Sequence, residues 1–343
     1  IVINIVDSYQ AINMLKVSKG FRGKVIATLH GIEHSYLRDF AEHADTIDAV
    51  ICTNRLSRQL VIRHSGIDET RVHYAPYGVV TDPAPLQPRV MADGGMTIAY
   101  VGRFEETQKR IGDLVSILQR VLDEIPGASI LVAGDGPDRP VLERWINDNT
   151  AGQVDYKGIL GADDLEREVY GRADVLLLTS CWETGPIVAW EAMARGVLLV
   201  SSRYTGLQQE GSLVDRENCL LFEVGDVGAA MQCLHQARDP GTRSRIAGNG
   251  RRLVEQRYSR NTSIDAWHAC LQQVCSQDSI LPGKIVELPV EPGRLSKWFG
   301  NQVGEQVRTL LGSKFVHNGP GGEWPHSNHG SVLSHSELLD ALT

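Results

Sequence analysis

The chain has 343 residues, of which 42% are hydrophobic and 22% charged, so its composition is that of a globular protein with room for two domains. Its 34 basic and 42 acidic residues give a net charge of -8, which argues against a general, non-specific nucleic-acid-binding protein. The six cysteines form neither a CxxC pair nor a set with zinc-ligand spacing, and no apolar run approaches the ~20 residues of a membrane span, so a cytoplasmic protein with reduced thiols is expected.

The first part of the chain alternates short apolar runs with amphipathic stretches. The predicted strands are residues 1–6, 24–30, 49–53 and 71–77, and the predicted helices are 36–44 and 55–66. The sequence enters its first strand without a methionine or a polar lead-in, so we expect roughly two or three βα units, of ~30 residues each, to be missing before it. A Pro-rich stretch over 79–95 then predicts a linker.

The second part of the chain repeats this alternation in a longer series. Its predicted strands are 96–102, 128–134, 154–160, 174–180, 197–202 and 219–224, and its predicted helices include 111–125, 139–149, 165–173 and 186–196. Continuous Val/Ile/Leu strands separated by helices indicate a parallel sheet that is covered on both faces. Two such series predict an α/β protein with two Rossmann-like domains that face each other across a cleft, the first of them incomplete.

The end of the chain has a different character. A helix over 259–277 is expected to close the second series, and the residues after it form a tail with one predicted helix at 295–311. The predicted domains are therefore 1–85, 86–277 and the tail 278–343.

Two glutamates stand in the stretch SCWETGPIVAWEAMARG, residues 180–196, directly after a predicted strand. Pro186 favours the first position of a helix, which places Glu183 in the loop at the end of the strand and Glu191 in the second turn of the helix. In a doubly wound sheet, ligands bind beyond the carboxyl ends of the strands. Arg103 and Lys109 follow another such strand and supply positive charge at the same edge.

These groups together suit a ligand that has both anionic and hydroxyl-rich parts. Cations and the free N–H groups of a helix N-terminus would hold phosphates, and carboxylates would accept hydrogen bonds from sugar hydroxyls. A nucleotide sugar has all of these parts.

Several segments in order, VGRF, QKRIGDL, ILVAGDGP, VDYKGIL, SCWETGPIVAWEAMARG and ENCLLFEVGD, resemble the retaining glycosyltransferases of family 4, the group 1 glycosyltransferases, which have the GT-B fold. The resemblance covers the second part of the chain nearly end to end and the first part more loosely. It implies an enzyme that moves a sugar, with retention of configuration, from a UDP- or GDP-sugar to a glycan, lipid-linked or small-molecule acceptor. It also implies that no metal and no cofactor take part.

The resemblance implies roles for individual residues. Glu183 would bond the donor sugar near its anomeric centre, and Glu191 would bind the ribose hydroxyls. Arg103 and Lys109 would hold the diphosphate and stabilise the charge that develops as it leaves. The implied catalytic residues are Glu183, His30, Arg103 and Lys109, and the implied donor-binding residues are Arg103, Lys109, Gly136, Ile159, Glu183, Thr184, Gly185 and Glu191.

The sequence departs from the family at Thr184-Gly185-Pro186, where the family usually has Gly-Phe-Gly or a similar run, and Pro186 removes one N–H that could bind the donor. Simpler interpretations stay open. The two glutamates could be solvated charges, the two cations could form surface ion pairs, and His30 could be structural. Two histidines in the tail, His326 and His329, fit a flexible tail better than a metal site.

Alternative functions also stay open. One is another GT-B enzyme, such as a sugar-nucleotide epimerase or a glycogen synthase type. Another is a GT-B subunit without catalytic activity that binds a partner or a nucleotide. Residues 55–66 form a modest basic amphipathic stretch, so peripheral association with the inner face of a membrane is an alternative to a plain surface helix.

Overall fold

A computed structural model of the chain describes residues 2–3, 9–32, 34–81, 95–149 and 152–283. The predicted linker falls outside the described residues over 82–94, and so does the tail beyond residue 283 with its predicted helix and the two histidines. The domain boundaries therefore stay predictions.

The first part of the chain folds into a four-stranded parallel sheet, as predicted. Its strands lie in chain order, β1-β2-β3-β4, and β2 and β3 are buried along their whole length. The strands are β1 (Val2–Ile3), β2 (Val25–Leu29), β3 (Ala49–Cys52) and β4 (Val72–Tyr74), and the helical segments are α1 (Tyr9–Lys19), α2 (His34–Glu42), α3 (Arg55–His64) and the 3-10 turn η2 (Glu69–Arg71).

The second part of the chain forms a six-stranded parallel sheet in the order β10-β9-β8-β5-β6-β7, the doubly wound arrangement. The strands are β5 (Thr97–Val101), β6 (Ser129–Ala133), β7 (Val154–Tyr156), β8 (Val175–Leu178), β9 (Leu198–Ser202) and β10 (Leu220–Phe222). The helical segments are α4 (Glu106–Lys109), α5 (Ile111–Glu124), α6 (Arg139–Asn149), α7 (Ala162–Leu165), the π-type turn η4 (Glu166–Tyr170), α8 (Ile187–Ala194), α9 (Leu207–Glu210), α10 (Val227–Ala237) and α11 (Pro240–Arg257).

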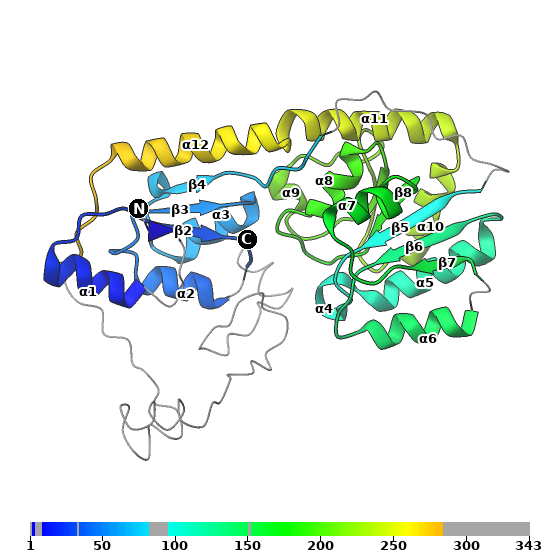
Figure 1. Ribbon diagram of the computed structural model, residues 1–343, viewed down its shortest axis with the longest axis horizontal. Coiled ribbons are helices and arrows are strands. Elements are labelled where there is room, and N and C mark those ends of the chain that lie inside the picture. The colour runs from blue at the N-terminus through cyan, green and yellow to red at the C-terminus, as the bar shows by residue number, and fades with distance from the viewer. Residues whose placement is uncertain (1, 4–8, 33, 82–94, 150–151, 284–343) are drawn as a thin grey trace, which may run out of the picture.

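Helices cover both faces of this second sheet (Figure 1), and each face has its own apolar cluster. One cluster lies under α5 and α10, and the other lies under α8. The sequence of α5 explains its position, because its buried residues recur at helical spacing and form one stripe. They are Ile111, Leu114, Ile117, Leu118 and Val121.

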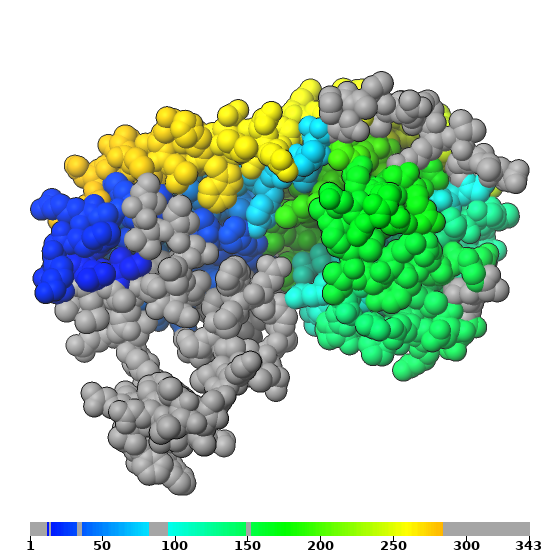
Figure 2. Space-filling view, in the orientation of Figure 1, coloured from blue at the N-terminus to red at the C-terminus, as the bar shows by residue number. Residues whose placement is uncertain are grey.

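The last described helix, α12 (Arg260–Ser276), packs against the first sheet (Figure 1) and not against the second. Cys270 and Val274 of α12 are buried against residues of β2 and β3 such as Ile26 and Ile51. The expectation that this helix closes the second series is therefore wrong. We call the first sheet with the helices that pack on it, including α12, the first half of the molecule, and the second sheet with its helices the second half. The chain crosses from the second half to the first just before α12, and Figure 2 shows this helix as a ridge over the first half.

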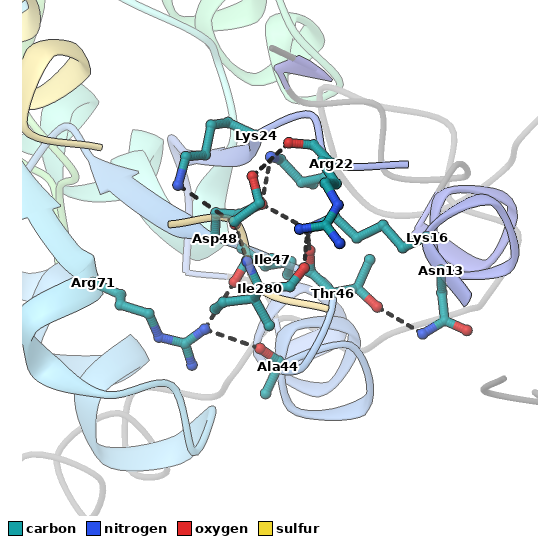
Figure 3. Close-up of polar contacts among 12 residues, drawn as sticks. Asn13, Lys16, Arg22, Lys24, Ala44, Thr46, Ile47, Asp48, Arg71 and Ile280 are labelled. Carbon is teal, nitrogen blue, oxygen red and sulfur yellow. Dashed lines mark hydrogen bonds and ion pairs between the residues drawn. The ribbon is translucent and has the colours of Figure 1, made fainter. Parts of the chain in front are cut away.

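A buried ion pair ties the chain after α12 to the first sheet (Figure 3). Lys16 Nζ lies 2.7 Å from Asp48 Oδ2, and the two side chains are 0% and 2% exposed. Asp48 also accepts hydrogen bonds from Val25 N and from Ile280 N, both at 2.7 Å. Lys16 in turn donates to the carbonyl oxygen of Ile280. One ion pair thus joins α1, the start of β2 and the chain that follows α12.

Candidate functional site

The candidate site lies at the carboxyl ends of β5 and β8. These strands are neighbours in the sheet but are not consecutive in the chain, so they form the switch point at which doubly wound sheets bind ligands. Hydrogen bonds join α4, which follows β5, to the loop that follows β8. They run from Cys181 N to Gln108 O at 2.8 Å, from Gln108 Nε2 to Trp182 O at 3.1 Å and from Thr179 Oγ1 to Lys109 O at 2.6 Å.

Lys109 and Glu183 form a largely buried ion pair at this switch point. Lys109 Nζ lies 2.5 Å from Glu183 Oε1, and Ser180 Oγ donates to the same oxygen at 2.6 Å. The two side chains of the pair are 16% and 6% exposed, so water screens their attraction less than at the surface. The structure thus brings together two residues that the sequence assigned to the site. Sequence reasoning missed Ser180, because a serine next to a strand carries no signal of its own.

The short helix α4 explains why Lys109 reaches this position. Glu105 caps the helix by accepting two backbone N–H bonds within its first turn. Arg110, with φ 54, is left-handed and ends the turn directly after Lys109. Arg103 leaves the same strand end, and its Nη2 lies 4.0 Å from Glu105 Oε2 with 37% of the side chain exposed. Arg103 is thus near the site but outside the buried pair, and its role stays a prediction.

Glu191 lies in the second turn of α8, as predicted, and is half-buried. Tyr170, at the end of η4, donates its hydroxyl hydrogen to Glu191 Oε2 at 2.8 Å. Burial raises the pKa of Glu191, and the hydrogen bond from Tyr170 opposes that rise only in part. Tyr170 is a second contact that the sequence did not reveal, because it comes from η4, which lies before β8 in the chain, whereas Glu191 lies after it.

We expect Glu191→Gln to raise the unfolding temperature at neutral pH. A raised pKa in the folded state means that the charged carboxylate costs stability above that pKa, and the amide removes this cost. The wild type regains the difference as the pH falls through the raised pKa toward the usual glutamate value. Thermal unfolding at several pH values between about 5 and 8 measures the difference, with Glu217→Gln as the matched exposed control. A difference that does not depend on pH would contradict this prediction.

Pro186 lies one position earlier than the sequence predicted. The helix α8 begins at Ile187, and Pro186 is its capping residue, whose carbonyl accepts from Ala189 N at 2.9 Å. The predicted place at the first helical position is therefore wrong by one residue, within the usual uncertainty of helix ends. Ala189 is the first residue of α8 whose N–H bonds within the helix, so the N–H groups of Ile187 and Val188 have no acceptor in the helix. Although Pro186 has no N–H, the first turn of α8 therefore still offers N–H groups to an anion.

Residues of the first half contact the loop that carries Glu183. The ring of Tyr77 lies beside Gly185, where a Cβ atom would stand 3.6 Å from Tyr77 Cδ2. His30 Nδ1 is hydrogen-bonded to the Tyr77 hydroxyl, and the two rings stack with their centroids 5.7 Å apart. Gly185 has φ 99, which glycine adopts without strain. His30 is therefore linked to the Thr184-Gly185 turn through Tyr77, which the sequence analysis had not singled out.

Two further residues of the predicted donor site have different surroundings. A Cβ atom at Gly136 would lie 2.2 Å from the carbonyl oxygen of Phe104, so packing against this backbone already requires glycine there. Ile159 is 77% exposed, next to Gly158 with φ 65. Its exposure leaves it accessible to a flat ring, but one exposed apolar side chain is common on protein surfaces. Both donor-binding roles stay predictions.

Within the described ranges, no three His, Cys, Asp or Glu side chains gather in a way that could hold a metal ion. The same ranges contain no helix with the length and apolar character needed to cross a membrane.

Comparison with known proteins connects this geometry to a family. Residues 95–258 match the family model described as glycosyl transferases group 1. The N-acetyl-alpha-D-glucosaminyl L-malate synthase of Bacillus anthracis is 24% identical over 280 residues, which cover 76% of this chain and 70% of that protein. A glycogen synthase of Mycobacterium tuberculosis is 25% identical over 222 residues, which cover 61% of this chain and only 47% of the relative.

Solved structures show the same architecture. The crystal structure of TarM from S. aureus aligns with a TM-score of 0.62 at 17% identity, covering 72% of this chain and 50% of that chain. That of HepE from Anabaena in complex with UDP aligns with a TM-score of 0.64 at 16% identity, covering 80% and 79%. At these identities the likeness shows the fold alone, and it confirms the predicted GT-B fold.

Proposed function

We propose, from the premise that residues 95–258 form a group 1 glycosyltransferase domain, that the protein transfers a sugar from a nucleotide-sugar donor to an acceptor hydroxyl. The observation that carries the proposal is the buried Lys109–Glu183 pair at the switch point of the second sheet. A cation and a hydrogen-bond-accepting carboxylate there match the two parts of such a donor, its diphosphate and its sugar.

When the donor binds, Lys109 and Glu183 would give up their contact with each other, and each would bind a different part of the donor. Lys109 would turn from Glu183 to the diphosphate, together with Arg103 and the first amides of α8, and Glu183 would accept from sugar hydroxyls near the anomeric carbon. Glu191 would accept from the ribose hydroxyls. The positive charges would lie beside the diphosphate, which gains negative charge as it leaves. They would therefore bind the transition state more strongly than the bound donor, without a metal ion.

We further propose that the anomeric configuration is retained and that the acceptor attacks from the face on which the diphosphate leaves. The leaving phosphate would take the proton of the acceptor hydroxyl. A glycosidase scheme with an acid and a nucleophile is not needed, because the leaving phosphate itself can take the proton of the acceptor.

Membrane association through residues 55–66 has little support in the structure. Leu56, Leu60 and Val61 of α3 are each at most 1% exposed and belong to the core of the first half. An interfacial helix needs an apolar face that can enter the bilayer. The interpretation as a plain surface helix therefore fits α3 better, and the acceptor class stays open among glycans, lipid-linked sugars and small molecules.

Release of nucleoside diphosphate from a panel of UDP- and GDP-sugars tests the proposed function. We expect the full chain to release it with one of these donors when acceptor is present. Glu183→Gln should abolish most of the release, and Arg120→Ala, a half-exposed residue of α5 that pairs with Glu124 of the same helix, should not. Absence of both release and nucleotide binding would sink the proposal. Binding without release would favour a subunit without activity, and a free epimerised sugar would favour an epimerase.

A further inference from the structure

We propose that Glu210 is a latch between the two halves of the molecule and that it positions Glu183. Glu210 ends α9 in the second half. Its Oε1 accepts hydrogen bonds from the hydroxyl groups of Tyr74 at 2.5 Å and Tyr258 at 2.8 Å, and its Oε2 accepts from Arg55 N at 3.1 Å. Tyr74 and Arg55 belong to the first half, so one carboxylate joins the halves through two of its three bonds.

The chemistry of this contact favours a charged carboxylate. Arg55 is the first residue of α3, and a ten-residue helix presents the positive end of its dipole there. The Arg55 guanidinium also lies over the Tyr74 ring, 4.5 Å from its centroid. Burial and the charge of Glu210 raise the pKa of Tyr74, so its hydroxyl keeps the proton that it donates. A glutamine side chain at position 210 would have the same shape, but its NH2 group would face the N–H of Arg55, so that two donors would meet without an acceptor.

The latch is connected to Glu183 through only a few residues. The chain just before α9 pairs with the loop after β8: Glu183 N donates to Thr205 O at 3.2 Å, and Thr205 N donates to Cys181 O at 2.9 Å. Gly206 lies between the two halves. A Cβ atom there would stand 2.7 Å from the carbonyl oxygen of Glu183 and 3.1 Å from Leu56 Cδ2. A shift of α9 against α3 would therefore move the backbone of Glu183 directly.

This arrangement makes Glu210 a positioning residue for the proposed sugar transfer. It contacts neither Lys109 nor the carboxylate of Glu183, so we expect no direct part for it in holding the diphosphate. Its loss should leave donor affinity nearly unchanged and reduce turnover, because the sugar-binding carboxylate would no longer be held in one orientation. The effect on turnover rests on the proposed function, whereas the effect on backbone order does not.

We expect Glu210→Gln to lower kcat about 10- to 100-fold while KM for the donor changes less than about 2-fold. Tyr74→Phe keeps the charge and removes one bond, so its kcat should fall less, and the two substitutions together should be non-additive. Glu217→Gln, an exposed glutamate of the same half, is the control. A raised KM with unchanged kcat would overturn the proposal, because Glu210 would then merely support the donor site.

Amide hydrogen exchange on the full chain gives a test that does not depend on activity. In Glu210→Gln we expect faster exchange at the first turn of α3 and at residues 180–184, with β5 and β6 unchanged. If Glu210→Gln shows faster amide exchange throughout the chain, Tyr74→Phe provides the decisive comparison, because it should show the same local increase more weakly. Unchanged exchange at 180–184 in both variants would overturn the latch. If Glu210→Gln shows this exchange pattern but the wild type neither binds nor turns over a nucleotide sugar, the proposed function fails and the role of Glu210 as a latch stands.

Discussion

Replacing Lys109 with methionine should lower nucleoside diphosphate release by about 10²- to 10³-fold, the usual cost of one lost electrostatic contact to a developing charge. Methionine keeps the unbranched stem but removes the ammonium group. The leaving diphosphate then lacks a cation that the fold holds at the switch point, and Glu183 keeps only the hydrogen bond from Ser180. We expect kcat to fall and the dissociation constant for the free nucleoside diphosphate to rise.

A double-mutant cycle separates the two tasks of Lys109. Because its Nζ lies 2.5 Å from Glu183 Oε1, Lys109→Met and Glu183→Gln should together cost much less than the sum of their single effects. Lys19→Met, an exposed lysine at the end of α1, is the matched control and should leave release unchanged. Release above half of the wild-type rate in Lys109→Met would show that the pair is structural.

The strands of the second sheet could be predicted because each is a short apolar run between turn signals. The order of the strands could not, since the 3.6- and 2-residue periods describe faces and not neighbours. The pairing of β8 with β5 brings Glu183 to Lys109 across 74 residues of sequence. Sequence reasoning therefore found both residues and gave them separate roles on a ligand, but it could not show that they bind each other.

The same limit explains the error at α12 and the missed contacts of Glu210. An amphipathic helix shows that one face is apolar but not which sheet that face covers, and α12 covers the first sheet although it follows the second in the chain. Glu210 lies in a single helical turn with no motif, and its partners come from three separate places along the chain. Contacts of this kind depend on how the halves meet, which local patterns do not encode.

The second large effect concerns stability. Asp48→Ala should destabilise the first half by about 3–5 kcal/mol, the usual cost of leaving one member of a buried ion pair without its partner. The substitution would leave the ammonium group of Lys16 buried without its counter-ion, and the N–H groups of Val25 (buried) and Ile280 (half-buried) would lose their acceptor. The N–H of Ile280 belongs to the chain that follows α12, so the hold of this chain on the sheet should weaken as well.

Lys16→Met should cost less than Asp48→Ala, because the carboxylate would keep both backbone N–H donors. Replacing both residues by apolar ones should not restore stability, since the N–H of Val25 would remain buried and that of Ile280 half-buried without an acceptor. Amide exchange in β2 and β3, compared with β5 and β6, locates the loss in the first half, and Asp123→Ala serves as an exposed control. Equal stability of Asp48→Ala and Asp123→Ala would refute this account. Recovery in the double variant would show that charge burial, and not hydrogen bonding to the backbone, determines the strength of this contact.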